Sequence, residues 1–179
     1  MELKTFIEQT LEECKRRLYR SLQGLTPEEL HWRPGAEANA IDFMLWHVAR
    51  VEDRWIHRFA QDTPEVWVRD GWCHRCRLPE QATGVNYTVQ QLADFPVLEL
   101  ALLQGYFDAV RQETLACLRD LPSTAFDVHP QRIPFPEVSS RPLPEDFTVG
   151  RMFRQLIGEE NQHLGQIAYL RGWQRGLDQ

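Results

Sequence analysis

The sequence has no excess of basic residues, which argues against a nucleic-acid-binding protein. Lys and Arg number 20 against 26 Asp and Glu, so the formal net charge is −6 and the pI is near 5.5. Proteins that bind phosphate backbones rely on clustered Lys and Arg side chains that release counterions. No such cluster occurs in these 179 residues, and we expect no nucleic-acid partner.

Long apolar runs are absent as well. No stretch approaches the roughly 18 apolar residues of a membrane span, and the opening MELK begins an amphipathic pattern rather than a signal peptide. Only four cysteines occur, and Cys14 and Cys117 fall within helical patterns, unlike the dense disulfide framework of a small secreted domain. These absences predict a cytoplasmic protein with reduced thiols and no membrane partner.

The composition that remains is that of an ordinary globular protein, with 42% hydrophobic and 26% charged residues. Apolar residues recur at three- and four-residue steps over four segments, which is the spacing of helices with one buried face. We expect long helices at residues 2–23, 40–60, 97–121 and 148–172. Without convincing strand alternation, residues 1–179 are predicted to form one all-α domain, a four-helix bundle.

Two long irregular connections separate the predicted helices. Residues 63–87 lose helical periodicity and residues 122–147 contain six prolines, and connections of this length are more often functional than idle. Thr26 and Thr88 are suited to cap short helices within the connecting segments. Gly172 is placed to end the last long helix.

The most informative polar residues lie in the segment GEENQHLGQ of the last predicted helix. A buried carboxylate or imidazole is costly unless it is paired, hydrogen-bonded or coordinated. Glu159 and His163 are four residues apart on one helix face, and His47 on the second long helix offers a third ligand. Because Glu160 and His163 are three apart and could also chelate, spacing alone leaves the carboxylate open. Two histidines and a carboxylate would leave an ion room for water or substrate, as in catalytic zinc sites.

Three segments resemble the DinB-like superfamily of bacterial metal-binding four-helix bundles. They are LTPEELHWRP at 25–34, LWHVARVEDRW at 45–55 and HLGQIAYLRG at 163–172. The resemblance extends over nearly the whole chain in order and spacing. It implies an up-down-down-up bundle with long irregular connections.

The resemblance also implies a metal site. One divalent ion, zinc or nickel, would be held by His47, Glu159 and His163. Many relatives have histidine where this chain has Glu159. The mycothiol-dependent maleylpyruvate isomerases of the same superfamily look similar to this chain in using histidine, glutamate and histidine.

Relatives that use low-molecular-weight thiols imply a thiol-dependent S-transferase or isomerase, in which the metal activates a thiol or water. A non-catalytic metal- or ligand-binding stress protein is the alternative, and a metal-free hydrogen-bonded cluster of the same three residues is a third hypothesis. The expected partners are a small-molecule substrate or thiol and a second copy of the chain in a homodimer.

Two further patterns indicate metal or redox chemistry less strongly. The CHRC segment at Cys73–Cys76 lacks the second cysteine pair of a zinc ribbon and the βαβ unit of a thioredoxin-like site. We expect it to be structural, unless its thiols approach the metal. The motif Glu-x-x-His, typical of di-iron bundles, occurs twice and ends at His31 and at His163. The first copy lies in a short turn. A di-iron site would also need two further carboxylates, for which Glu52 and Glu113 are only loose candidates.

Three arginines flank the candidate ligands in the sequence. They are Arg50, Arg54 and Arg171. We expect them on solvated helix faces, with bidentate binding of a substrate carboxylate as the alternative.

Overall fold

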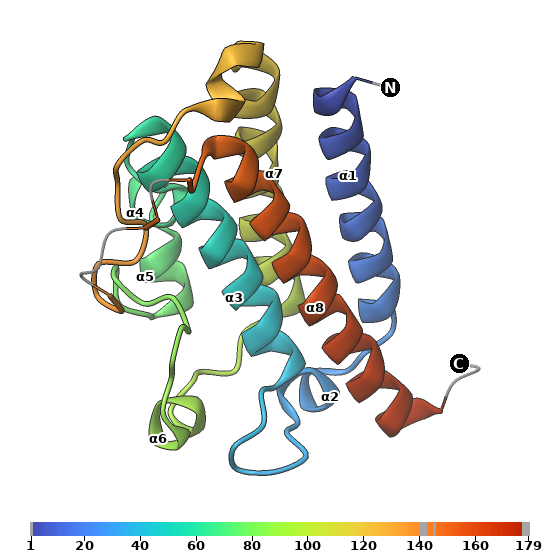
Figure 1. Cartoon of the computed structure of the whole chain (residues 1–179). Coiled ribbons are helices and arrows are strands. Elements are labelled where there is room, and N and C mark those ends of the chain that lie inside the picture. Colours follow the sequence, from blue (N-terminus) through green and yellow to red (C-terminus); the bar gives the residue numbers. More distant parts are fainter. Residues whose placement is uncertain (1, 140–142, 145, 177–179) are drawn as a thin grey trace.

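Four long helices dominate the computed structural model, which describes residues 2–139, 143–144 and 146–176 (Figure 1). They are α1 (Leu3–Leu22), α3 (Ile41–Asp53), α7 (Leu100–Asp120) and α8 (Val149–Arg175). Shorter helices lie between them: α2 (Pro27–His31), η1 (Arg54–Gln61), α4 (Val66–Arg69), α5 (Trp72–Cys76), α6 (Val89–Ala93) and η2 (Ser123–Asp127). The described residues contain no β-strand, which confirms the all-α prediction.

The long helices run in the predicted up-down-down-up order. Figure 1 shows α1 and α8 running in one direction and α3 and α7 in the other, so the connection from α3 to α7 must return along the bundle. Helix α3 packs against both α7 and α8, and α1 packs mainly against α8. None of the helices in the described part of the chain combines the length and apolarity needed to cross a bilayer.

Threonine side chains define the starts of three helices. Thr26 and Thr88 each form a capping box with the residue three positions later, and Thr148 accepts a hydrogen bond from the backbone N–H of Arg151 at the start of α8. These caps satisfy N–H groups that have no partner within the helix. The predictions made for Thr26 and Thr88 are therefore confirmed.

The predicted end of the last helix at Gly172 is wrong, because α8 continues to Arg175 and is capped by Gly176, whose φ is +81°. Tertiary contacts explain the additional turn. The Arg175 guanidinium is paired with Glu29 at 2.6 Å, and Arg171 donates to backbone carbonyls at the end of α1 at 2.8 and 3.3 Å. Arg171, which is partly exposed, thus anchors α8 to α1.

The long connections are more structured than their sequences predict. The segment predicted as an irregular stretch at 63–87 contains the short helices α4 and α5, and η2 follows α7. The second predicted helix, 40–60, is continuous in the structure but changes from α-helix to the π-helix η1 at Arg54. π-Helical turns occur preferentially at functional sites, and this one lies next to the candidate site described below.

A polar layer divides the core into two apolar clusters. One cluster contains Leu18 and Leu22 of α1 and Leu164 and Ile167 of α8, and the other contains Ile7, Leu11, Met152 and Leu156 of the same helices. Between them lie Glu52 of α3, Arg111 of α7 and Glu160 of α8, each at most 5% exposed. Helices α3, α7 and α8 therefore meet here through charged rather than apolar side chains.

Arg111 is the centre of this layer. Its guanidinium binds Glu52 through two hydrogen bonds of 2.8 and 2.9 Å, pairs with Glu160, and donates to the Leu11 carbonyl of α1 at 2.6 Å. Burial raises the pKa of Glu160 to about 8; the charge of Arg111 opposes this shift and that of Glu52 adds to it. The Glu160 carboxyl group beside this guanidinium therefore retains its proton near neutral pH.

Removal of the Arg111 charge should destabilise the fold strongly. In Arg111→Met the two buried carboxyl groups lose their cation, and we expect the free energy of unfolding to fall by about 3–5 kcal/mol. Chemical denaturation measures this loss. Arg119→Met, on the same helix, removes a side chain that is 56% exposed and 3.5 Å from Glu8, and it should change stability by no more than about 0.5 kcal/mol. Equal effects of the two substitutions would contradict a structural role for the polar layer.

Candidate metal centre

Three side chains from two antiparallel helices converge at one point of the bundle. His47 comes from α3, and Glu159 and His163 come from adjacent turns of α8; their ligand atoms all lie within 4.8 Å of one another. The Oε1 atom of Glu159 is 3.4 Å from Nε2 of His47 and 3.2 Å from Nε2 of His163. The structure thus brings together the three residues that the sequence analysis grouped, while metal binding itself stays a prediction.

Both imidazole rings are oriented through their other nitrogen. Nδ1 of His47 lies 2.6 Å from the backbone carbonyl oxygen of Thr83, and Nδ1 of His163 lies 2.8 Å from Oε1 of Gln166. A carbonyl oxygen can only accept a hydrogen bond, so each Nδ1 carries the proton. Metal-ligating histidines almost always make such a hydrogen bond, which leaves Nε2 free as the ligand atom.

The orientation of the rings brings two imidazole nitrogens to one carboxylate. With Nδ1 engaged elsewhere, each imidazole directs its Nε2 toward the same carboxylate oxygen of Glu159. Contacts with the side chains of His163 and His47 lower the pKa of Glu159 to about 2, so the carboxyl group is ionised. Two nitrogen lone pairs and an ionised oxygen form the donor set of an open zinc-type site, and a divalent cation fits it.

The structure resolves the choice between the two adjacent glutamates. Glu160 is directed toward Arg111 and Glu52 in the polar layer, whereas Glu159 faces His47. One residue step rotates a helical side chain by about 100°, so the two carboxylates reach different neighbours. Glu159 is therefore the carboxylate of the candidate site.

Side chains of α3 and η1 hold the loop that orients His47. His47 Nδ1 binds the carbonyl of Thr83, Arg50 Nε donates to that of Ala82 at 2.9 Å, and Arg54 Nη2 donates to that of Gln81 at 3.2 Å. Positions 47, 50 and 54 share one face of a helix. Three consecutive carbonyl groups are thus bound by three successive side chains on that face. The loop residues could not be predicted from the sequence, because an irregular segment gives no local signal of the helix that it contacts.

Arg50 and Arg54 are neither solvated nor free for a substrate, contrary to both expectations. Their exposed fractions are 0% and 1%. Arg50 pairs with Asp53 at 3.1 Å and Glu65 at 2.6 Å, and Arg54 pairs with Glu65 at 3.1 Å and Glu137 at 2.7 Å. Both arginines stabilise the loops around the site.

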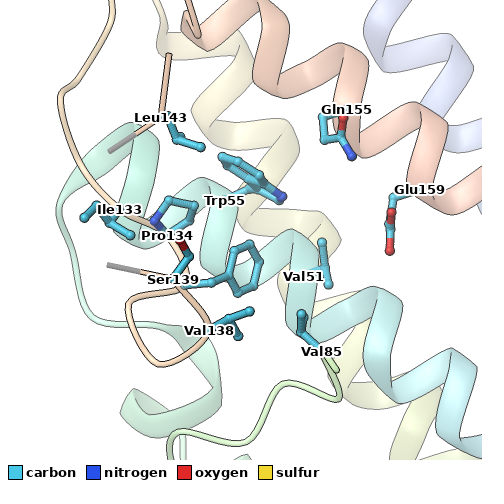
Figure 2. Close-up of a pocket in the computed structure, with 11 residues that line it drawn as sticks. Val51, Trp55, Val85, Ile133, Pro134, Val138, Ser139, Leu143, Gln155 and Glu159 are labelled. Atoms are coloured by element: carbon cyan, nitrogen blue, oxygen red, sulfur yellow. The ribbon is translucent and has the colours of Figure 1, made fainter. Parts of the chain in front are cut away.

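A pocket of about 390 Å³ lies beside Glu159. Figure 2 shows Glu159 and Gln155 projecting from α8 on one side, with Ile133 and Pro134 of the proline-rich connection on the opposite side. Most lining residues are apolar; the whole set is Val51, Trp55, Val85, Ile133, Pro134, Phe135, Val138, Ser139, Leu143, Gln155 and Glu159. Its volume lies within the usual range for small-molecule sites, about 300–1,000 Å³.

Arg54 also fastens the proline-rich segment over this pocket. Its Nη1 donates to the backbone carbonyl of Pro134 at 3.1 Å and to Glu137 at 2.7 Å. Trp55, the next residue, stacks on Phe147 with ring centroids 5.2 Å apart and contacts Phe135 edge-on at 5.6 Å. The first turn of η1 therefore holds the pocket wall in place.

The other metal patterns of the sequence lie apart from this site. Cys73 and Cys76 are buried free thiols on α5, and neither belongs to the His47 group; Cys73 instead lies near His74 and Glu80. His31 is paired with Asp42 at 2.7 Å. Its Glu-x-x-His copy lies on the short helix α2, away from the three grouped residues.

Gly84 leaves space for the His47 ring. A substitution at this position directly tests whether the loop contacts orient His47 for metal binding. Its φ is +83°, and a Cβ atom there would lie 2.8 Å from Nδ1 of His47. Gly84→Ala should displace the loop or the ring, and we expect zinc affinity to fall about tenfold or more. Competition with a chromophoric chelator measures this affinity.

Gly71→Ala is the matched control for this substitution. Gly71 has a similar φ of +71°, but nothing lies within 4 Å of the position that a Cβ atom would take there. The control imposes the same kind of backbone strain without touching His47, so zinc affinity should not change. Equal losses in both variants would show that strain alone, not the His47 contact, governs the affinity.

Comparisons with known proteins agree with this architecture. The family model of the DinB superfamily matches residues 10–167. The crystal structure of a conserved protein from Enterococcus faecalis superposes with a TM-score of 0.79 at 21% sequence identity, with 96% of each chain covered, which shows a shared fold. No curated protein is significantly similar in sequence. The chain belongs to the DinB superfamily.

Proposed function

We propose that this protein is a metal-dependent enzyme acting on small molecules, with one divalent ion, zinc or nickel, held by His47, Glu159 and His163. The supporting observation is that both imidazoles present Nε2 to one ionised carboxylate while each Nδ1 is engaged elsewhere. A divalent cation at this point would take up both nitrogens and the carboxylate oxygen as ligands. The family membership is consistent with this proposal.

The pocket residues would position a substrate next to the three candidate metal ligands. Glu159 belongs to both the candidate metal site and the pocket wall. A cation bound there would lower the pKa of a thiol or water at its open position and so supply a nucleophile at neutral pH. Trp55 and Phe135 would exclude water from the electrophile, and the proposed reaction is a thiol-dependent S-transfer or isomerisation.

Metal content tests the first part of this proposal. Elemental mass spectrometry on untagged protein should find about one zinc or nickel ion per chain, as expected for a single three-ligand site, and none in His163→Ala. Cys73→Ala is the matched control, because Cys73 belongs to the separate group with His74 and Glu80. Metal that survives in His163→Ala but is lost in Cys73→Ala would place the ion elsewhere. Wild-type protein that takes up no zinc, nickel, iron or manganese would reject the metal site.

Turnover tests the second part. Metal-loaded protein should consume a chromogenic electrophile such as 1-chloro-2,4-dinitrobenzene only when a thiol is present, and His47→Ala should lose the activity. His74→Ala, which replaces an exposed histidine outside the site, should retain it. Full metal occupancy without turnover across a panel of thiols and electrophiles would contradict an enzyme and favour a metal- or ligand-binding protein.

A further inference from the structure

The pocket beside Glu159 discriminates between ligands by polarity. Of its lining residues, eight are apolar, and the polar ones are Ser139, Gln155 and Glu159. No lining residue in the described part of the chain is cationic. A ligand body that carries carboxylates would therefore lose its hydration there without gaining a counter-charge.

Among the residues that the structure describes, two arginines near the pocket wall are paired with carboxylates. Arg54 is 1% exposed and is paired with Glu65 and Glu137. Arg58 lies 3.6 Å from Glu65 and 3.4 Å from Glu137. Both arginines thus fasten the proline-rich segment through Glu137.

The two ends of the cavity have opposite character. Glu159 joins the pocket to the histidine pair at one end, and Figure 2 shows Trp55 and Leu143 on the side away from Glu159. Phe135 adds a further aromatic ring to the lining. A divalent cation has two positive charges against the single negative charge of Glu159, so a singly anionic donor group would balance the site. The ligand that matches both ends has an anionic donor group attached to an uncharged body.

We propose that the pocket binds the aromatic or branched apolar body of a hydrophobic thiol, whose sulfur lies at the His47–Glu159–His163 end. This inference rests on the proposed function, because it needs the metal site. It departs from hydrophilic low-molecular-weight thiols such as glutathione, whose body carries charges that this pocket does not match. Hydrophobic burial supplies the selectivity.

Cobalt-substituted protein provides a readout that does not depend on activity. Binding of a thiol at the metal is followed by its charge-transfer absorption, which gives dissociation constants for 2-phenylethanethiol, 2-mercaptoethanol and glutathione. We expect 2-phenylethanethiol to bind about tenfold more tightly or better than either hydrophilic thiol, since only it buries an aromatic ring. His163→Ala should show no such absorption with any of them.

Val138 supplies the variant that tests the pocket itself. Its side chain lines the cavity but the residue is 38% exposed, so Val138→Glu places a carboxylate in the pocket without disturbing the core. The preference for 2-phenylethanethiol should disappear in this variant. Val97→Glu, at a residue that is 61% exposed and outside the pocket, should retain the preference.

The outcomes separate the two proposals. Cobalt binding with equal affinities for the three thiols, with tighter binding of glutathione, or with a preference that survives Val138→Glu would overturn the inference and leave the metal site intact. Failure of the wild-type protein to bind cobalt would overturn the proposed function and this inference with it.

Discussion

The contact of Arg111 with Glu52 and Glu160 sets the register of the whole bundle. Glu52 lies on α3, which also carries His47, and Glu160 lies on α8, which carries Glu159 and His163. Both helices that supply candidate ligands are therefore held by the same guanidinium. Because a buried ion pair is stable only in near-ideal geometry, this contact determines the height and rotation of α3 relative to α8. Those two parameters decide whether His47 and Glu159 meet.

The polar layer and the candidate site are linked through adjacent residues of α8. Adjacent residues of α8 perform the two tasks: Glu160 is buried against Arg111, and Glu159 faces the histidines and the pocket. A shift of α8 by one residue could place Glu160 where Glu159 now lies, and Asn161 would then face Arg111. The orientation of His47 also depends on the backbone of residues 81–83. Three side chains of α3 and η1 donate hydrogen bonds to its carbonyl groups. Arg54 joins this loop to the proline-rich segment, so the histidine orientation and the pocket wall share an anchor.

Much of the fold follows from local patterns in the sequence. Apolar periodicity predicts the four long helices because each buries one face, and threonine caps mark several starts. The grouping of His47 with His163 follows from the same reasoning, since polar residues on an inward face need a common partner. The choice of Glu159 over Glu160 needed the resemblance to the superfamily, because two adjacent carboxylates differ only in which neighbour they reach.

The features that the sequence did not predict all depend on long-range contacts between polar groups. Arg50 and Arg54 have the composition of a solvated helix face, and only the folded loops show that their charges are buried against Glu65 and Glu137. Thr83 contacts His47 through its backbone carbonyl, so the type of side chain at position 83 gives no sign of this role. The extra turn of α8 beyond Gly172 is stabilised by Glu29, more than a hundred residues earlier in the chain.

Anomalous diffraction from crystals of the zinc-loaded protein tests the central claim most directly. We predict one strong zinc peak at roughly 2.0–2.2 Å from Nε2 of His47, Nε2 of His163 and a carboxylate oxygen of Glu159. A protein that shows no peak there, or whose zinc lies only between Cys73, His74 and Glu80, would contradict it.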